Sequence, residues 1–157
     1  MAQQNSFHIP LSDPDRTVAL GHAIAPVLRP GDTLLLTGTL GAGKSHLARA
    51  IIRARLGREE DVPSPTFTLV QTYDHAEGDL WHADLYRLSH PDEVIELGLD
   101  EAFETAIALV EWPDRLGDLV PADPIRVELR YDGEGRMAEI TFVGRPDLAD
   151  CLMDFTK

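Results

Sequence analysis

The chain has 157 residues, a length that fits one domain with a hydrophobic core of its own. Asp and Glu outnumber Lys and Arg by 27 to 14, which gives a formal net charge of −13 and argues against tight binding of nucleic acid by the chain alone. Cys151 is the only cysteine, so an internal disulfide and a cysteine-based zinc site are excluded. No apolar run approaches the ~20 residues that span a bilayer, and the first residues lack a signal-peptide pattern. We therefore expect a cytoplasmic protein without membrane contact.

The N-terminal part of the sequence predicts two strands and two helices. A short edge strand is expected over residues 7–11, followed by a helix that Ser12 or Asp13 caps and that ends at Pro30-Gly31. Residues 33–37 form the short apolar run that is typical of a strand buried on both faces. Residues 44–56 then carry an apolar stripe at helical spacing, with Gly57 as the stop signal.

The rest of the sequence continues the alternation and ends in a hairpin, which the segment Asp132-Gly133-Glu134-Gly135 indicates. The elements that we expect are, in chain order, strands over residues 67–73 and 80–85, a helix over 91–97, a strand over 107–111 that Pro113 terminates, strands over 125–131 and 137–143, and a helix over 146–155. This order predicts one domain over residues 1–157 with a three-layer α/β fold, similar to the P-loop NTPases, with a mixed central sheet and a C-terminal β-hairpin.

The segment Gly-Thr-Leu-Gly-Ala-Gly-Lys-Ser at residues 38–45 matches the phosphate-binding pattern Gly-x-x-x-x-Gly-Lys-Ser in full, between a predicted strand and a predicted helix. Such a loop turns backbone N–H groups toward phosphate oxygens, and the helix N-terminus adds partial positive charge. Lys44 is expected to neutralise the β- and γ-phosphates, and Ser45 to ligate Mg²⁺. The absence of the GTP-specific pattern Asn-Lys-x-Asp favours ATP. The predicted contacts are Gly38, Leu40, Gly41, Ala42, Gly43, Lys44, Ser45 and His46.

Three further residues are candidates for the chemistry. Asp84 and Glu111 each follow an apolar run, and the carboxyl ends of strands in an α/β sheet face the ligand crevice. The cleaner run before Glu111 favours this residue as the metal-site acid, although local sequence does not assign the two roles and either residue could simply close a strand. Thr66 lies in a proline-stiffened loop that is either a connector or a switch whose hydroxyl senses Mg²⁺ and the γ-phosphate.

Four segments, in their order and spacing, resemble the bacterial TsaE (YjeE) family. They are the phosphate loop at 38–45, Ser-Pro-Thr-Phe-Thr-Leu-Val at 64–70, His-Ala-Asp-Leu-Tyr-Arg-Leu at 82–88 and Val-Glu-Trp-Pro at 110–113. The resemblance extends over roughly residues 12–143, and its last two segments are distinctive. The sequence departs from the family at Thr39, where an acidic residue is usual, and at His46, where Thr or Ser is common.

The resemblance implies a small P-loop ATPase that assists threonylcarbamoyl modification of the adenosine next to the anticodon in certain tRNAs. Family members work with a TsaD–TsaB heterodimer, which carries the transferase chemistry, so tRNA would be held by the partners. ATP hydrolysis would reset that complex between turnovers. By this analogy Ser45 and Asp84 handle Mg²⁺, Thr66 senses the nucleotide, Glu111 orients the attacking water, and Trp112 lies near the base. These implied roles replace the pattern's preference for Glu111 as the metal acid.

Two other functions fit a phosphate loop. A small-molecule kinase would need an acceptor pocket and usually an arginine-bearing lid, and the sequence after Leu85 offers only Arg87 and Arg115. A module that uses ATP as a structural ligand would lack a water-orienting acid, so Glu111 argues against it. The arginines that follow the loop form either a solvated helix face or a small docking patch; they are Arg49, Arg53, Arg55 and Arg58.

Overall fold

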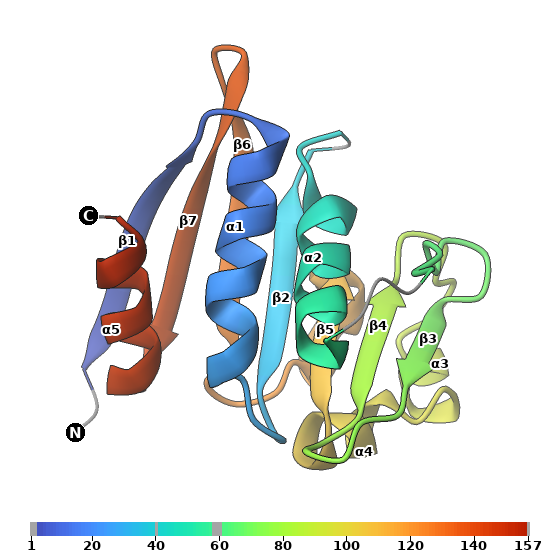
Figure 1. The fold of residues 1–157 in the computed structure, drawn as a ribbon. Coiled ribbons are helices and arrows are strands. Elements are labelled where there is room, and N and C mark those ends of the chain that lie inside the picture. Colours follow the sequence, from blue (N-terminus) through green and yellow to red (C-terminus); the bar gives the residue numbers. More distant parts are fainter. Residues whose placement is uncertain (1–2, 40, 58–60, 157) are drawn as a thin grey trace.

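The computed structural model describes residues 3–39, 41–57 and 61–156, and its centre is a seven-stranded mixed sheet in the order β1-β7-β6-β2-β5-β4-β3 (Figure 1). The four central strands are mutually parallel: β6 (Ile125–Asp132), β2 (Thr33–Gly38), β5 (Ile107–Glu111) and β4 (Leu80–Asp84). The outer strands pair antiparallel: β1 (Gln4–Leu11) with β7 (Gly135–Val143), β7 with β6, and β3 (Val70–Tyr73) with β4. The predicted mixed sheet and terminal hairpin are therefore confirmed.

Helices cover both faces of the sheet and give the three predicted layers. One face carries α1 (Pro14–Ile24), the 3₁₀ turn η1 (Ala25–Val27), α2 (Lys44–Leu56) and α5 (Pro146–Phe155). The other face carries α3 (Asp92–Glu96), α4 (Leu99–Thr105) and the 3₁₀ segment η2 (Pro113–Leu119). Figure 1 shows α1, α2 and α5 side by side across the first of these faces.

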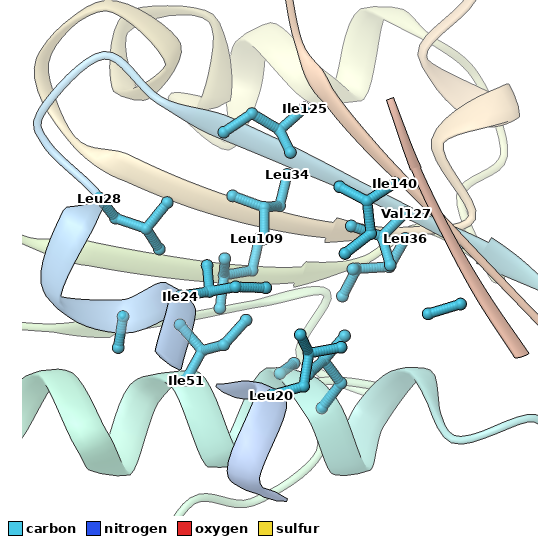
Figure 2. Close-up of a cluster of buried hydrophobic side chains, with 14 of the residues drawn as sticks. Leu20, Ile24, Leu28, Leu34, Leu36, Ile51, Leu109, Ile125, Val127 and Ile140 are labelled. Atoms are coloured by element: carbon cyan, nitrogen blue, oxygen red, sulfur yellow. The ribbon is translucent and has the colours of Figure 1, made fainter. Parts of the chain in front are cut away.

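The sheet strands are apolar on both sides because each side packs against helices. In β2, Leu34 and Leu36 belong to the core under α1 and α2, whereas Leu35 belongs to the core under α3 and α4. Figure 2 shows the first of these cores, with Leu20 and Ile51 from the helices facing the sheet. A strand buried on both faces reads as a continuous apolar run, which is why residues 33–37 were recognisable in the sequence.

Several element bounds match the predictions and others do not. Asp13 caps α1, since its side chain accepts a hydrogen bond from the Arg16 N–H at 2.9 Å. The α-helical geometry then ends at Ile24 rather than at Pro30, because Pro26 has no N–H to continue the ladder. The strand predicted over residues 67–73 begins only at Val70, because Leu69 has a φ of 67° in a turn closed on Pro65.

Two other expectations concern the surface. Of the four arginines after the phosphate loop, Arg55 donates to the carbonyl oxygens of Ala25 at 3.0 Å and Glu77 at 3.3 Å, so its contacts connect α2 to other parts of the fold. Arg58 lies outside the described residues. Within the described ranges, no helix combines the length and apolar character needed to cross a membrane.

Candidate nucleotide-binding site

The phosphate loop connects the carboxyl end of β2 to the first turn of α2. Gly38, Gly41 and Gly43 have φ values of 137°, 83° and 104°, a backbone region that residues with a side chain rarely adopt. A Cβ at Gly38 would also collide with the carbonyl oxygen of Leu129, so this position requires glycine for space as well as for geometry. The pattern Gly-x-x-x-x-Gly-Lys-Ser thus has the strand-loop-helix context that phosphate binding needs. Leu40, one of the predicted contacts, lies outside the described residues.

Lys44 is buried at the start of α2 and faces the loop. Its Nζ donates to the Gly38 carbonyl oxygen at 2.5 Å and to that of Thr39 at 3.4 Å. Burial lowers the pKa of Lys44, and the carboxylates of Glu111 and Asp84 offset part of this effect. The ammonium is therefore held between loop carbonyls and two acids, at the position from which it can bind a phosphate oxygen.

Trp112 follows β5 in the left-handed backbone region, with a φ of 57°, and its ring lies 4.1 Å from Nζ of Lys44. The ring also packs against that of Tyr86, with centroids 4.9 Å apart. The resemblance implies that Trp112 lies near the base, and in the structure its ring lies beside Lys44, the predicted phosphate ligand.

The two candidate acids lie at the carboxyl ends of neighbouring parallel strands. Asp84 in β4 is the register partner of Glu111 in β5, and both side chains are buried, with 6% and 2% exposed. Glu111 in turn pairs with Leu36 of β2, the strand that leads into the phosphate loop. Glu111 is thus one strand away from the loop, and Asp84 is two strands away.

The hydrogen bonds divide the site into two sets, and the first surrounds Glu111. Ser45 Oγ donates to Glu111 Oε1 at 2.8 Å, and His82 Nε2 lies 2.7 Å from Glu111 Oε2. Ser45, the residue that both readings of the sequence assign to Mg²⁺, therefore contacts Glu111 and not Asp84. His82 did not enter the predicted site, because its strand reads as an apolar run with one polar interruption.

The second set surrounds Asp84. Thr66 Oγ1 donates to Asp84 Oδ2 at 3.2 Å, and the Tyr86 N–H donates to Oδ1 at 3.0 Å. Ser64 Oγ lies 2.7 Å from Thr66 Oγ1. The proline-stiffened loop thus brings Thr66 within hydrogen-bond distance of the second acid.

A cavity of about 300 Å³ joins these groups, and its lining is Gly41, Gly43, Lys44, Ser45, His46, Arg49, Thr66, Asp84, Glu111 and Trp112. A hydroxyl and two carboxylates are hard oxygen ligands of the kind that Mg²⁺ prefers. No group of three or more His, Cys, Asp or Glu in the described ranges is arranged to hold a metal unaided. A magnesium ion here would take further ligands from phosphate oxygens and water, which is its usual habit in nucleotide sites.

A second cavity, of about 320 Å³, lies on the other side of the loop, between the start of α1 and the β6–β7 hairpin. Gly43 and His46 line both cavities, and Asp13 and Arg136 line only the second. Arg136 donates to the Gly41 carbonyl oxygen at 3.2 Å, so the hairpin contacts the phosphate loop directly. Gly43 and His46 therefore lie between the two cavities.

Comparisons with known proteins agree with one another. The sequence model of the family described as "Threonylcarbamoyl adenosine biosynthesis protein TsaE" matches residues 11–138. The chain is 39% identical over 132 residues to the tRNA threonylcarbamoyladenosine biosynthesis protein TsaE of Rickettsia bellii, covering 83% of this chain and 92% of that protein. It is 36% identical to the TsaE protein of Bacillus subtilis over 131 residues, covering 83% and 80%. The crystal structure of Bacillus subtilis YdiB superposes with a TM-score of 0.75 at 28% identity, covering 99% of this chain and 95% of that one.

Proposed function

Because the chain belongs to the TsaE family, we propose that it acts in tRNA threonylcarbamoyladenosine biosynthesis as an ATP-hydrolysing accessory factor of a TsaD–TsaB pair. The observation that carries the ATPase part is the convergence of two buried carboxylates, Asp84 and Glu111, on the cavity beside Lys44. A protein that only holds ATP needs the phosphate loop and one metal-site acid. A second buried acid at the same point supports hydrolysis, because an attacking water must be oriented and must lose a proton.

The contacts support a different division of roles from the one that the resemblance implies. Ser45 donates to Glu111 at 2.8 Å, so Glu111 is the acid next to the hydroxyl that ligates Mg²⁺. We therefore assign Ser45 and Glu111 to the metal, and Asp84 with Thr66 to the attacking water. Mg²⁺, when bound, neutralises charge on the phosphate oxygens. Lys44 adds positive charge on the same side, where it stabilises the charge that develops in the transition state.

The base has a natural place in the second cavity, between His46 and Arg136. His46 Nε2 lies 3.2 Å from the Pro14 carbonyl oxygen, which positions the ring between the two cavities. In this arrangement the nucleotide passes over Gly43 and the start of α2. Trp112 then shields the phosphate end, where its ring already covers Lys44.

The kinase alternative is less well supported. Its lid arginines would have to face the cavity beside the phosphate loop. Arg87 lies instead over the ring of Phe67, at 4.7 Å, and Arg115 is 4.0 Å from the carboxylate of its neighbour Asp114. Neither residue lines the cavity, and Arg49 is the arginine that does. Phosphoryl transfer to water is therefore the reaction that the site favours.

The first test is an ATPase measurement with and without a TsaD–TsaB pair from the same organism. We expect Mg²⁺-dependent release of phosphate that rises when the pair is added, since the partners would complete or release the active state. ATP consumption that appears only with a small-molecule acceptor, together with a phosphorylated product, would instead identify a kinase. ATP binding without hydrolysis under both conditions would indicate a module that binds ATP as a structural ligand.

A second prediction follows from the charge. With a formal net charge of −13, the chain alone should not bind tRNA at submicromolar concentrations at physiological salt, since phosphate contacts need clustered cations. Fluorescence polarisation with labelled tRNA measures this directly, and the TsaD–TsaB pair serves as the positive control. Tight, salt-sensitive binding by the isolated chain would contradict the prediction and would point to Arg49 and Arg53 on α2.

A further inference from the structure

His82 is a buried imidazole that the proposed ATPase mechanism leaves without a role. It is 0% exposed and lies in β4, two residues before Asp84, so both side chains project from the same face of the strand. Its register partner in β5 is Leu109, whose side chain belongs to the core beneath α1 and α2. The histidine therefore lies directly behind the acids of the site, out of reach of solvent.

The contacts of Glu111 account for both of its carboxylate oxygens. Oε1 accepts from Ser45 at 2.8 Å and Oε2 lies 2.7 Å from His82 Nε2, which acts as the donor because the carboxylate oxygen accepts. The other ring nitrogen, Nδ1, is buried and has no hydrogen-bond partner among the described residues. An unpaired buried polar atom costs stability, so packing alone would favour an apolar side chain at position 82. The hydrogen bond to Glu111 is therefore the interaction that a histidine provides at this position and an apolar side chain would not.

We propose that His82 is a positioning residue that holds the carboxylate of Glu111 toward Ser45 and the Mg²⁺ position. The terminal torsion of a glutamate is broad, so the carboxylate needs fixed partners to keep one orientation. When the Ser45 hydroxyl turns to a metal ion, its bond to Oε1 is lost, and the bond from His82 is the side-chain hydrogen bond that remains. Residues that hold a metal ligand in this way typically change metal affinity by 10–100-fold when they are removed. This inference rests on the proposed function, because it assigns Glu111 to the metal.

The test compares variants that differ in one hydrogen bond. His82→Leu fills the space without a donor. His82→Gln keeps an N–H at about the reach of Nε2, so it should restore the bond. His90→Leu is the matched control, since the side chain of His90 is 68% exposed and does not line the cavity of the site. For each protein, a fluorescent ATP analogue is titrated at increasing Mg²⁺ concentrations and in EDTA, and the thermal unfolding midpoint is recorded.

We expect His82→Leu to need about tenfold more Mg²⁺ for half-maximal tightening of nucleotide binding. Its affinity in EDTA should stay close to that of the wild type, and its unfolding midpoint should fall because a buried carboxylate oxygen of Glu111 loses its donor. The Mg²⁺ response is therefore the deciding readout, and His82→Gln should recover most of it. A purely structural histidine would lower the unfolding midpoint and leave the Mg²⁺ response of the folded protein unchanged. If His82→Leu does not fold, His82→Asn replaces it, because the shorter amide cannot reach Glu111.

Two results would overturn the proposal: a wild-type Mg²⁺ response in the donor-less variant, or an equal shift in that variant and in His82→Gln. Failure of the proposed function is recognised separately. If nucleotide binding by the wild-type protein does not respond to Mg²⁺, the proposed magnesium site is refuted, and the role of His82 is refuted with it. If the wild type responds and His82→Leu responds equally, only the role of His82 is refuted.

Discussion

Lys44→Ala is expected to weaken ATP binding by roughly tenfold to more than a hundredfold and to leave the fold intact. The variant lacks the ammonium group and so loses a charge-assisted contact with the phosphates, which is worth about 1.5–3 kcal/mol of binding free energy. In the structure Nζ contacts two loop carbonyl oxygens and the Trp112 ring, and Lys44 is a member of neither hydrophobic core cluster. Titration calorimetry with ATP and Mg²⁺ gives the affinity, and circular dichroism with thermal melting checks the fold.

Arg130→Ala serves as the control for loss of a positive charge, because Arg130 is 47% exposed and pairs with Glu128 on the sheet surface. Its ATP affinity should equal that of the wild type. If folded Lys44→Ala also binds ATP as the wild type does, then residues 38–45 are not the nucleotide site and the proposed function loses its basis. A loss in both variants would indicate a general effect of charge on nucleotide binding.

The fold was largely predictable where a sequence signal covers a whole element. The bounds of α2 were predicted correctly because Gly57, with a φ of 72°, marks its end in the sequence as well as in the structure. In contrast, α4 was missed, because its seven residues contain only three buried side chains and complete no second repeat of a helical pattern. The 3₁₀ segment η2 was also missed, since it starts at a proline that the sequence marked only as the end of a strand.

The residues of the candidate site could be predicted from the sequence, whereas the contacts between them depend on the order of the strands in the sheet. The phosphate loop, Asp84, Glu111 and Thr66 were all named from the sequence, and they line one cavity. Which acid is nearer to Ser45 depends on β5 being the neighbour of β2, with β4 beyond it. No local pattern in the sequence encodes that strand order. The sequence alone therefore does not show whether the roles implied by the family resemblance fit the positions of the two acids. His82 was missed for the same reason, since only the register of β4 on β5 brings it to Glu111.

The two acids should give different phenotypes, and the pair of variants Glu111→Gln and Asp84→Asn decides the division of roles. Glu111→Gln is expected to weaken Mg²⁺-dependent ATP binding on the order of tenfold and to lose hydrolysis as well, because its neutral amide is a poor partner for the metal. Asp84→Asn should keep ATP bound and lower the single-turnover rate by roughly 10²-fold or more, since orienting water and taking up its proton matter chiefly in the transition state. Each variant replaces a carboxylate by an amide of the same shape, so the neighbouring strands should stay in register.

The measurement combines ATP affinity, with and without Mg²⁺, and single-turnover hydrolysis in the presence of the TsaD–TsaB pair. Asp114→Asn is a suitable control, because that side chain is 73% exposed and lies close behind Trp112 in the chain without lining the cavity. The opposite pattern, in which Asp84→Asn loses Mg²⁺-dependent binding and Glu111→Gln loses only turnover, would restore the roles implied by the family resemblance. The bond from Ser45 to Glu111 would then have to break when ATP and Mg²⁺ bind. Hydrolysis at the wild-type rate by either variant would remove that residue from the catalytic set and would leave the other acid as the buried carboxylate, among the described residues, that orients the water.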